Sequence, residues 1–574
     1  MSGNYINLTQ YHRWKTSEVR IGNLTVGGTS PIRIQSMTNT DTNDTEACVE
    51  QAIRIIEAGG ELVRLTAQGS KEAENLGNIR RKLRLKGYNT PLVADIHFNP
   101  RAALAAAEQV EKVRINPGNF VDPAKQFKTI EYTEKEYIEE LANIRYKFLP
   151  FLALCKKNDT AIRIGVNHGS LSDRIMSRYG DTPEGMVESC MEYLRIANEV
   201  GFKDIVLSIK ASNTRIMVHT VRLLVKTMED EGMNYPLHLG VTEAGDAEDG
   251  RIKSAVGIGA LLVDGIGDTI RVSLSEEPEL EIPVAKTLVD YVAKRAGHEP
   301  VRTFDTSFYH PFSYSKVISD SVKQVGGENV PVVVGSVELK GDLRPDLIFK
   351  ENKLYSDNEE ISFVELKDDF EKNELAGLKE DTVLVLSTQN KNSHAALRSL
   401  RLRLLEAGIK NPVVLKLSYA EPDKETFMLK AATDAGILFL DGLGDGLWLE
   451  DENQTPETLV QTAFSILQAS RDRMTKPDYI SCPGCGRTLF DLQKTIARIK
   501  AKTSHLKGLK IGIMGCIVNG PGEMADADYG YVGAGRGRIS LYKGKACIER
   551  NIPEEEAVEK LIKLIKENGD WVEK

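Results

Sequence analysis

Short apolar runs alternate with longer helical patterns through the first half of this 574-residue chain. Each run is rich in Val, Ile and Leu and precedes a segment with helical spacing, which is typical of parallel strand-helix units. Their mean spacing of about 34 residues suits a strand-helix-strand repeat. We therefore predict an α/β fold in which residues 1–297 form a TIM (β/α)8 barrel. The eight predicted strands are PIRIQSM from Pro31, ELVRLTA from Glu61, PLVADIH from Pro91, EKVRIN from Glu111, TAIRIGV from Thr160, DIVLSIK from Asp204, PLHLGVTE from Pro236 and DTIRVSL from Asp268.

One polar side chain stands near the end of each predicted strand, and six of the eight are cations. Barrel active sites lie where the strands end, so these side chains are expected to converge on one mouth. The alternative is that they point outward beneath the helices and pair with acids there. Six cations around one cavity repel each other unless an anion is bound, and Arg suits phosphate oxygens, which favours a diphosphate ligand. The eight residues are Arg33, Arg64, Asp95, Arg114, Arg163, Lys210, Glu243 and Arg271.

Residues 298–475 repeat part of the barrel pattern. LLVDGIGDTIRV from Leu261 recurs as LFLDGLGDGLWL from Leu438, and IVLSIKASN from Ile205 parallels LVLSTQNKN from Leu384. This similarity indicates a duplicated block. The copy carries Gln389, Ala420 and Trp448 where the barrel carries Lys210, Glu243 and Arg271. We therefore expect a degenerate, barrel-like insertion domain with a structural role and no active site of its own.

Composition and charge limit the classes of partner. With 74 Lys and Arg against 83 Asp and Glu, the net charge is −9, so no bulk positive field exists to hold nucleic acid or an anionic membrane. No stretch approaches the roughly 20 apolar residues of a membrane span. Seven cysteines are too few for a disulfide scaffold, and their odd number favours a reducing compartment. We expect a cytoplasmic protein.

The third predicted domain, residues 476–574, holds four of the seven cysteines and alternates strands with helices. Cys482 and Cys485 form a C-x-x-C pair in ISCPGCGRT, and Cys516 follows in MGCIVNGPGE. Zinc ribbons, redox thiols and iron-sulfur sites all use such patterns. A fourth ligand would come from Cys547, which would complete a four-thiolate site, or from Glu523. A carboxylate on an iron otherwise held by thiolates would be exchangeable and would leave that iron open to substrate.

Seven ordered strings resemble one family, the 4-hydroxy-3-methylbut-2-enyl-diphosphate synthases of the non-mevalonate isoprenoid pathway. The resemblance covers about residues 1–297 and 476–574, and the insertion between them is similar to the three-domain form of the family. The strings are PIRIQSMTNTDT, RINPGN, IRIGVNHGSL, GVTEAG, GIGDTIRVSL, SCPGCGRT and MGCIVNGPGE.

The resemblance implies a reductive ring opening. The expected substrate is 2-C-methyl-D-erythritol 2,4-cyclodiphosphate, and the expected product is (E)-4-hydroxy-3-methylbut-2-enyl diphosphate, formed with two electrons and loss of water. The resemblance also implies a C-terminal α+β domain, similar to a sulfite-reductase half, that carries a 4Fe-4S cluster. The implied cluster ligands are Cys482, Cys485, Cys516 and Glu523.

The family's diphosphate-binding positions fall on Arg64, Arg114, Arg163, Lys210 and Arg271, in agreement with the cations at the strand ends. Glu243 is the expected acid that protonates the departing hydroxyl. Further polar groups are expected to bind or orient the substrate, or in one case to bond a cluster sulfide. They are Asp95, His97, Asn116, Asn167, His168, Ser208, Ser212, Ser273 and Asn519.

Two other functions compete with this interpretation. A cluster-dependent hydro-lyase would use the open iron only as a Lewis acid, with no net electron flow. A regulatory protein would hold zinc in the same cysteines, although the chain lacks the aromatic-basic stripe of nucleic-acid binders. We expect flavodoxin or ferredoxin as the electron donor and a homodimer as the assembly.

Overall fold

The computed structural model describes residues 6, 8–97, 99–122, 131–339, 343–375, 377–517, 522, 524 and 526–573. The chain divides into two compact units. One unit contains Met1–Trp14, Arg251–Ile266 and Thr287–Thr475. The other contains Lys15–Gly250, Gly267–Lys286 and Lys476–Lys574, so it unites most of the barrel with the cysteine-bearing C-terminal region.

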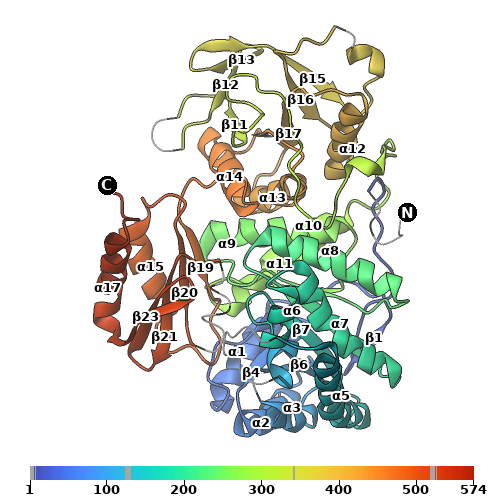
Figure 1. Ribbon diagram of the computed structural model, residues 1–574, viewed down its shortest axis with the longest axis vertical. Coiled ribbons are helices and arrows are strands. Elements are labelled where there is room, and N and C mark those ends of the chain that lie inside the picture. The colour runs from blue at the N-terminus through green and yellow to red at the C-terminus, as the bar shows by residue number, and fades with distance from the viewer. Residues whose placement is uncertain are drawn as a thin grey trace. The chain divides into compact units, whose positions relative to one another are not determined.

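Eight parallel strands form the predicted barrel, which confirms the fold class (Figure 1). The strand order is β8-β7-β6-β5-β4-β3-β10-β9. A bridge between Leu207 and Leu237 joins the two ends of this order, so the sheet closes. The strands are β3 (Arg33–Met37), β4 (Leu62–Ala67), β5 (Leu92–Ile96), β6 (Lys112–Ile115), β7 (Ala161–Asn167), β8 (Ile205–Lys210), β9 (His238–Leu239) and β10 (Thr269–Ile270).

Helices follow the strands and begin at polar caps. The side chain of Asp44 accepts a hydrogen bond from the Ala47 backbone N–H, and Asn213 accepts from those of Arg215 and Ile216. Such caps satisfy backbone donors that have no partner within the helix. The helices are α1 (Thr45–Glu57), α2 (Ser70–Leu85), α3 (Pro100–Ala107), α4 (Pro117–Phe120), α5 (Glu134–Lys157), α6 (Asp173–Tyr179), α7 (Pro183–Glu199), α8 (Thr214–Asp230), α9 (Ala247–Ser254), α10 (Ala260–Val263) and α11 (Glu281–Ala293).

A short hairpin closes the amino end of the barrel. Strands β1 (Val19–Ile21) and β2 (Leu24–Val26) pair antiparallel ahead of β3. Their buried apolar side chains pack on Leu62, Val93 and Val206, which lie near the starts of barrel strands. The amino end is therefore filled, and the carboxyl end is left for a site.

The insertion has a second eight-stranded sheet in the order β14-β13-β12-β11-β18-β17-β16-β15. Its pairings are parallel from β15 through β18 to β11 and β12, and antiparallel from β12 to β14. The sheet is therefore barrel-like and contains an antiparallel meander. The strands are β11 (Val332–Gly335), β12 (Leu347–Lys350), β13 (Lys353–Ser356), β14 (Glu359–Ile361), β15 (Phe363–Lys367), β16 (Val383–Ser387), β17 (Val413–Tyr419) and β18 (Gly446–Asp451).

The same backbone hydrogen bonds occur in both sheets at two aspartates that the sequence similarity aligns. Asp268 accepts at its side chain from the Leu237 N–H, at 2.9 Å, and at its carbonyl from the Arg33 N–H, at 2.9 Å. The equivalent Asp445 accepts from the N–H groups of Val413 and Val332, each at 3.0 Å. Each Asp therefore ties its own strand to both neighbours.

The C-terminal region forms a five-stranded mixed sheet with helices α15 (Leu492–Thr503) and α17 (Glu554–Glu567). Its first three strands are parallel and its last three antiparallel. We call residues 476–574 the thiol domain. Its strands are β19 (Asp478–Ser481), β20 (Lys510–Met514), β21 (Tyr529–Gly535), β22 (Arg538–Lys543) and β23 (Ala546–Pro553). No described helix of the protein combines the length and apolarity that a bilayer crossing requires.

Candidate active site

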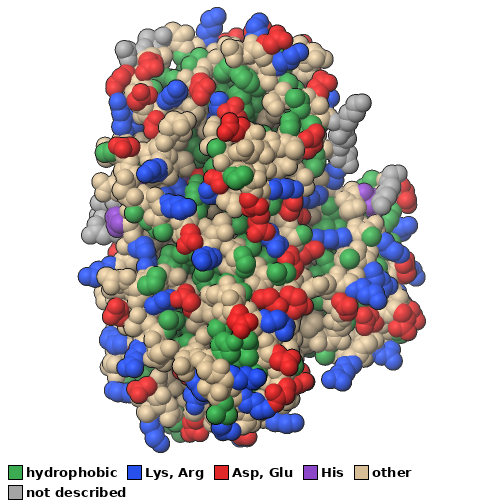
Figure 2. Space-filling model, turned by 180° about the vertical axis from the view of Figure 1, so that it is seen from behind, with side chains coloured by type: hydrophobic (Ala, Val, Ile, Leu, Met, Phe, Trp, Pro, Cys, Tyr) green, Lys and Arg blue, Asp and Glu red, His purple; other side chains and the backbone are tan. Residues whose placement is uncertain are grey.

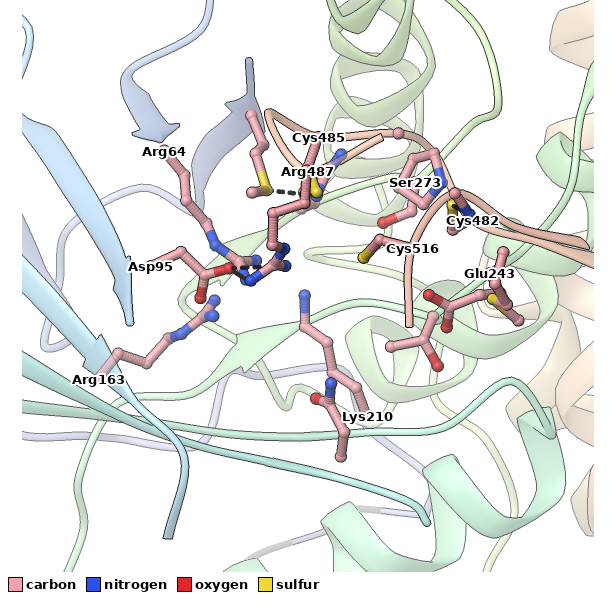
Figure 3. Close-up of a pocket in the computed structure, with 18 residues that line it drawn as sticks. Arg64, Asp95, Arg163, Lys210, Glu243, Ser273, Cys482, Cys485, Arg487 and Cys516 are labelled. Carbon is pink, nitrogen blue, oxygen red and sulfur yellow. Dashed lines mark hydrogen bonds and ion pairs between the residues drawn. The ribbon is translucent and has the colours of Figure 1, made fainter. Parts of the chain in front are cut away.

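A cavity of about 90 Å³ lies between the carboxyl ends of the barrel strands and the thiol domain (Figure 3). It has room for only a few water molecules. Among the described residues its lining includes five cations, two carboxylates and three cysteines. They are Arg64, Arg163, Lys210, Arg271, Arg487, Asp95, Glu243, Cys482, Cys485 and Cys516. Asn167 and Ser273 also line it.

Asp95 on β5 is the central anion of the cluster. Its carboxylate is fully buried and lies 2.6 Å from Nη2 of Arg64 and 3.1 Å from Nη1 of Arg114. Burial would raise the pKa of Asp95, but Arg64, His97 and Arg114 together hold that pKa well below its usual value. Asp95 therefore stays ionised and offsets part of the local positive charge.

His97 and Arg114 complete this network without lining the cavity. His97 Nε2 lies 3.1 Å from Asp95 Oδ2 and 2.8 Å from Arg114 Nη1. Burial lowers the pKa of His97 to about 3, and the cations Arg487 and Arg114 add to that effect against Asp95. His97 is therefore neutral at physiological pH and positions Arg114, which also donates to the Gly165 carbonyl at 2.9 Å.

Glycine at position 165 makes room for Arg114. A Cβ there would lie 2.8 Å from Arg114 Nε and 3.0 Å from Ser208 Oγ, closer than carbon side chains pack. Gly165 and Ser208 are paired across β7 and β8, so the predicted Ser208 faces this buried layer. The predicted Ser212 is buried just beyond β8.

Arg163 and Lys210 carry the least compensated charge. Nε and Nη1 of Arg163 have no hydrogen-bond partner among the described residues. Burial lowers the pKa of both side chains well below the usual value, and neighbouring Arg residues lower it further. Buried polar groups are ordinarily paired, so these two cations point to an anionic ligand in the cavity.

Arg271 is held by a different carboxylate. Its Nη2 and Nε lie 3.0 and 3.1 Å from the two carboxylate oxygens of Glu281 at the start of α11. This two-point contact fixes the guanidinium plane against Met37 while the side chain still lines the cavity. Glu281 is therefore a site-building residue that the sequence patterns did not reveal.

Glu243 lies in a left-handed backbone conformation with a φ of 49°. Few residues other than glycine adopt this conformation, and such strain is often found at functional sites. The side chain is 5% exposed and lines the cavity beside Thr242. Figure 3 shows its carboxylate near Cys482 and Cys516.

Several predicted residues have other positions. Arg33 opens β3 at the amino end of the barrel, where its Nη1 lies 2.7 Å from Glu61, so the expectation that it stands at the mouth is wrong. Asn116 caps α4 through the Gly118 N–H. His168 Nε2 lies 3.4 Å from Asp181 Oδ1. Neither Asn116 nor His168 is among the lining residues, and the predicted Asn519 and Glu523 lie outside the described residues.

The thiol domain contacts the barrel of its own chain. Ser275 Oγ lies 2.8 Å from Ser481 Oγ and donates to the Cys482 carbonyl at 2.9 Å. Ion pairs of Lys500 with Asp246 and of Lys476 with Asp249 add to this contact. The cavity is therefore built by a single chain.

The three cysteines on the cavity wall supply the donor type that iron-sulfur clusters use. Within the described ranges, no three His, Cys, Asp or Glu side chains converge as ligands of one metal ion. In a four-iron cluster each thiolate binds a different iron, so thiols spread around one cavity fit such a cluster. Thiolates are soft ligands, and soft ligands favour iron-sulfur clusters. Burial raises the pKa of the Cys482 thiol, and the Gly515 N–H, which donates to Cys482 Sγ at 3.2 Å, partly opposes that effect.

The clustered cations are internal, whereas the surface seen in Figure 2 carries charges of both signs. Figure 2 shows Lys and Arg interspersed with Asp and Glu over the face in view. The positive cavity is therefore a local feature of an acidic chain. Fold and site together define a TIM-barrel protein of the enzyme type, with clustered cations and three thiols at the carboxyl ends of the barrel strands.

Comparison with known proteins supplies the family. Residues 16–286 match the GcpE TIM-barrel domain, and residues 478–567 match the GcpE protein C-terminal domain. The chain belongs to the GcpE family.

Full-length relatives are also similar over nearly the whole chain. A protein of Parabacteroides distasonis is 57% identical over 98% of this chain and 99% of its own length. One of Phocaeicola vulgatus is 56% identical over 99% and 100%. One of Bacteroides fragilis is 56% identical over 99% and 98%. Each of these relatives is named 4-hydroxy-3-methylbut-2-en-1-yl diphosphate synthase (flavodoxin).

Proposed function

We propose that this chain forms 4-hydroxy-3-methylbut-2-en-1-yl diphosphate by reductive ring opening of 2-C-methyl-D-erythritol 2,4-cyclodiphosphate. The observation that carries this proposal is the meeting of five cations and three cysteines in one cavity. Cations suit the diphosphate, and thiols suit a redox cofactor. The product is the compound that the relatives' names give.

The barrel cations bind the diphosphate. Arg163 and Lys210 should gain most from a bound anion, because both are buried beside other cations. Arg64 and Arg271 are pre-oriented by Asp95 and Glu281, so they bind with little further ordering. As the ring opens, the phosphate oxygen that leaves carbon gains negative charge, and these groups stabilise it.

The cavity must enlarge to admit this substrate. Its volume of about 90 Å³ holds only a few waters, whereas a cyclic sugar diphosphate is much larger. Substrate entry therefore requires the thiol domain to move away from the barrel mouth, and closure then excludes water from the reaction.

Glu243 is the proton donor in this proposal. It lines the same cavity as the barrel cations and the cysteines. A bound diphosphate neutralises the nearby cations and so raises the tendency of the Glu243 carboxyl to hold a proton. That proton converts the departing hydroxyl into water. Ser273 and Asn167, also on the wall, orient substrate oxygens.

Cys482, Cys485 and Cys516 would hold a 4Fe-4S cluster, with Glu523 as the fourth ligand. When bound, the cluster supplies the two electrons of the reaction one at a time. The relatives' names specify flavodoxin, so we propose flavodoxin as the donor. The homodimer remains a prediction.

The test is anaerobic turnover of the cyclodiphosphate with and without a low-potential reductant. Product should form only with reductant, and in proportion to the electrons supplied. Full activity without reductant would favour the hydro-lyase instead. A colourless protein with stoichiometric zinc would contradict the cluster itself.

A further inference from the structure

Arg487 differs from the other cations of the cavity in its origin. Arg64, Arg163, Lys210 and Arg271 come from barrel strands or their ends, and among the described lining residues only Arg487 is a cation from the thiol domain. It follows Cys485 by two positions in the chain. Its side chain is 6% exposed, so the thiol domain places a buried charge at the barrel mouth.

The partner of Arg487 on the barrel is Asp95. Nη2 of Arg487 lies 3.8 Å from Asp95 Oδ2, the oxygen that also contacts Arg64. Figure 3 shows the three side chains meeting at this point. A single carboxylate therefore joins cations from both domains, and its charge is shared between them.

Glycine at position 486 allows this approach. A Cβ there would lie 2.5 Å from the Thr40 carbonyl oxygen and 2.8 Å from Thr66 Oγ1. Thr66 lies on β4 two residues after Arg64, so the Gly486 backbone rests directly on the barrel beside the cation cluster. Any side chain at this position would separate the two surfaces.

The same guanidinium also reaches the thiols. Arg487 lines the same cavity as Cys485 and Cys516. Burial opposes its charge, but Cys485, Asp95 and Cys516 favour the charged form and raise its pKa overall. The side chain thus spans the distance between the candidate cofactor ligands and the anion-binding layer of the barrel.

We propose that Arg487 is a positioning residue that couples closure of the thiol domain to the redox centre, through its ion pair with Asp95 and its place beside Cys485 on the cavity wall. When the thiol domain moves away from the barrel, Arg487 leaves Asp95, which then keeps only its barrel cations. With the domain closed, the cation lies beside the centre that receives electrons, where it stabilises the more negative, reduced form. This inference rests on the proposed function.

The experiment compares Arg487→Gln, Arg487→Lys and the matched control Arg498→Gln, in which an exposed Arg on α15 of the same domain is changed. The full chain is loaded with iron and sulfide. Iron content, the midpoint potential of the cluster and hydrogen exchange of the backbone amides around residues 39–42 and 486–490 are measured without substrate. Turnover is measured afterwards.

Arg487→Gln should lower the midpoint potential and increase amide exchange in both segments at unchanged iron content, and reduce kcat about a hundredfold. Arg487→Lys keeps the positive charge but loses the planar guanidinium group. Its cluster should therefore have a midpoint potential close to that of the wild type, while the backbone amides of both segments exchange faster. Arg498→Gln should match the wild type. A wild-type potential and wild-type exchange in Arg487→Gln would overturn the proposal, as would equal shifts in Arg498→Gln. If Arg487→Gln does not fold, unchanged exchange in Arg487→Lys overturns it.

Failure of the proposed function would look different. A wild-type enzyme that binds the cyclodiphosphate but does not reduce it would refute the reaction. The potential and exchange comparisons would still decide the role of Arg487, because neither uses substrate.

Discussion

Gly259 and Gly436 occupy equivalent positions in the two copies of the duplicated block, and each supports the same contact. A Cβ on Gly259 would lie 2.7 Å from Oγ1 of Thr433, and a Cβ on Gly436 would lie 2.9 Å from Cγ2 of Val256. Val256 and Thr433 are themselves equivalent. The helical segment 255–259 and helix α13 (Lys424–Leu440) therefore pack on each other about a local twofold relation.

Adding a side chain at either glycine should destabilise this helix pair. Gly259→Ala and Gly436→Ala should each lower the free energy of unfolding by about 1–3 kcal/mol, the usual cost of overpacking. Urea denaturation followed by circular dichroism measures this. In Gly259→Ala combined with Thr433→Gly, the clash is relieved, so the combined cost should be smaller than the sum of the single costs. Simple additivity would contradict the contact.

Removing the central anion should destabilise the barrel mouth. Asp95→Asn leaves Arg64 and Arg114 without their carboxylate, and breaking such a buried pair costs about 3–5 kcal/mol. Because the folded pKa of Asp95 is depressed, its contribution is present above the unfolded pKa of about 3.9 and is lost as pH falls through the folded pKa. Denaturation of both proteins at several pH values should show a constant difference from pH 7 to about pH 5. A difference that vanishes by pH 5 would contradict this assignment.

Diphosphate binding should take up protons at Lys210. Burial first, and then Arg163, Arg64 and Arg271, lower the pKa of Lys210 in the free protein, and a bound anion raises it. The affinity for diphosphate should therefore be greatest at low pH. It should fall as the pH rises from the pKa of Lys210 in the free protein to its higher pKa in the complex. Calorimetry in buffers of different ionisation enthalpy counts the protons. Lys210→Met should bind more weakly and take up fewer protons; equal uptake by both proteins would remove Lys210 from this role.

Glu243→Gln should separate binding from chemistry. The change preserves shape but removes the proton, so iron content and substrate affinity should stay near wild type while product formation falls about 10²–10⁴-fold. Product analysis beside a binding titration measures both. Undiminished turnover would exclude Glu243 as the proton donor.

Paired substitutions distinguish Cys516, a proposed cluster ligand, from Cys547, the alternative fourth ligand. Cys516 lines the cavity, whereas Cys547 lies on the outer strand β23, half-buried against a small apolar cluster that includes Met514 and Tyr542. Cys516→Ser should lose the visible iron-sulfur absorbance, and Cys547→Ser should retain it. Loss of absorbance in Cys547→Ser would make it a ligand.

The barrel was predictable because each strand is a compact apolar run followed by a helical pattern. All eight predicted strands are present, and the duplicated block has the parallel order that its similarity to the barrel requires. The hairpin of β1 and β2 was not predicted, because strands of three residues leave no readable alternation. The antiparallel strands β13 and β14 of the insertion have no counterpart among the barrel strands β3 to β10.

The position of each residue along its strand limited the site prediction. Arg33 and Arg64 both lie in apolar strands, but Arg33 is the first residue of its strand and Arg64 lies further along, so only Arg64 reaches the mouth. Strand boundaries uncertain by two residues are enough to hide this difference. Arg487 was missed because its role depends on a contact between domains. The pair Gly486-Arg487, directly after Cys485, was the sequence feature that could have indicated this role.

The paired Asp268 and Asp445 allow the protein to serve as its own reference. Both make the same backbone contacts, yet the barrel carries the buried cations Lys210 and Arg271 where the insertion carries Gln389 and Trp448. Gln389 is exposed where the equivalent Lys210 is buried, so Gln389→Lys and Lys210→Met together would separate the effect of burying a cation at a strand end from that of carrying one there.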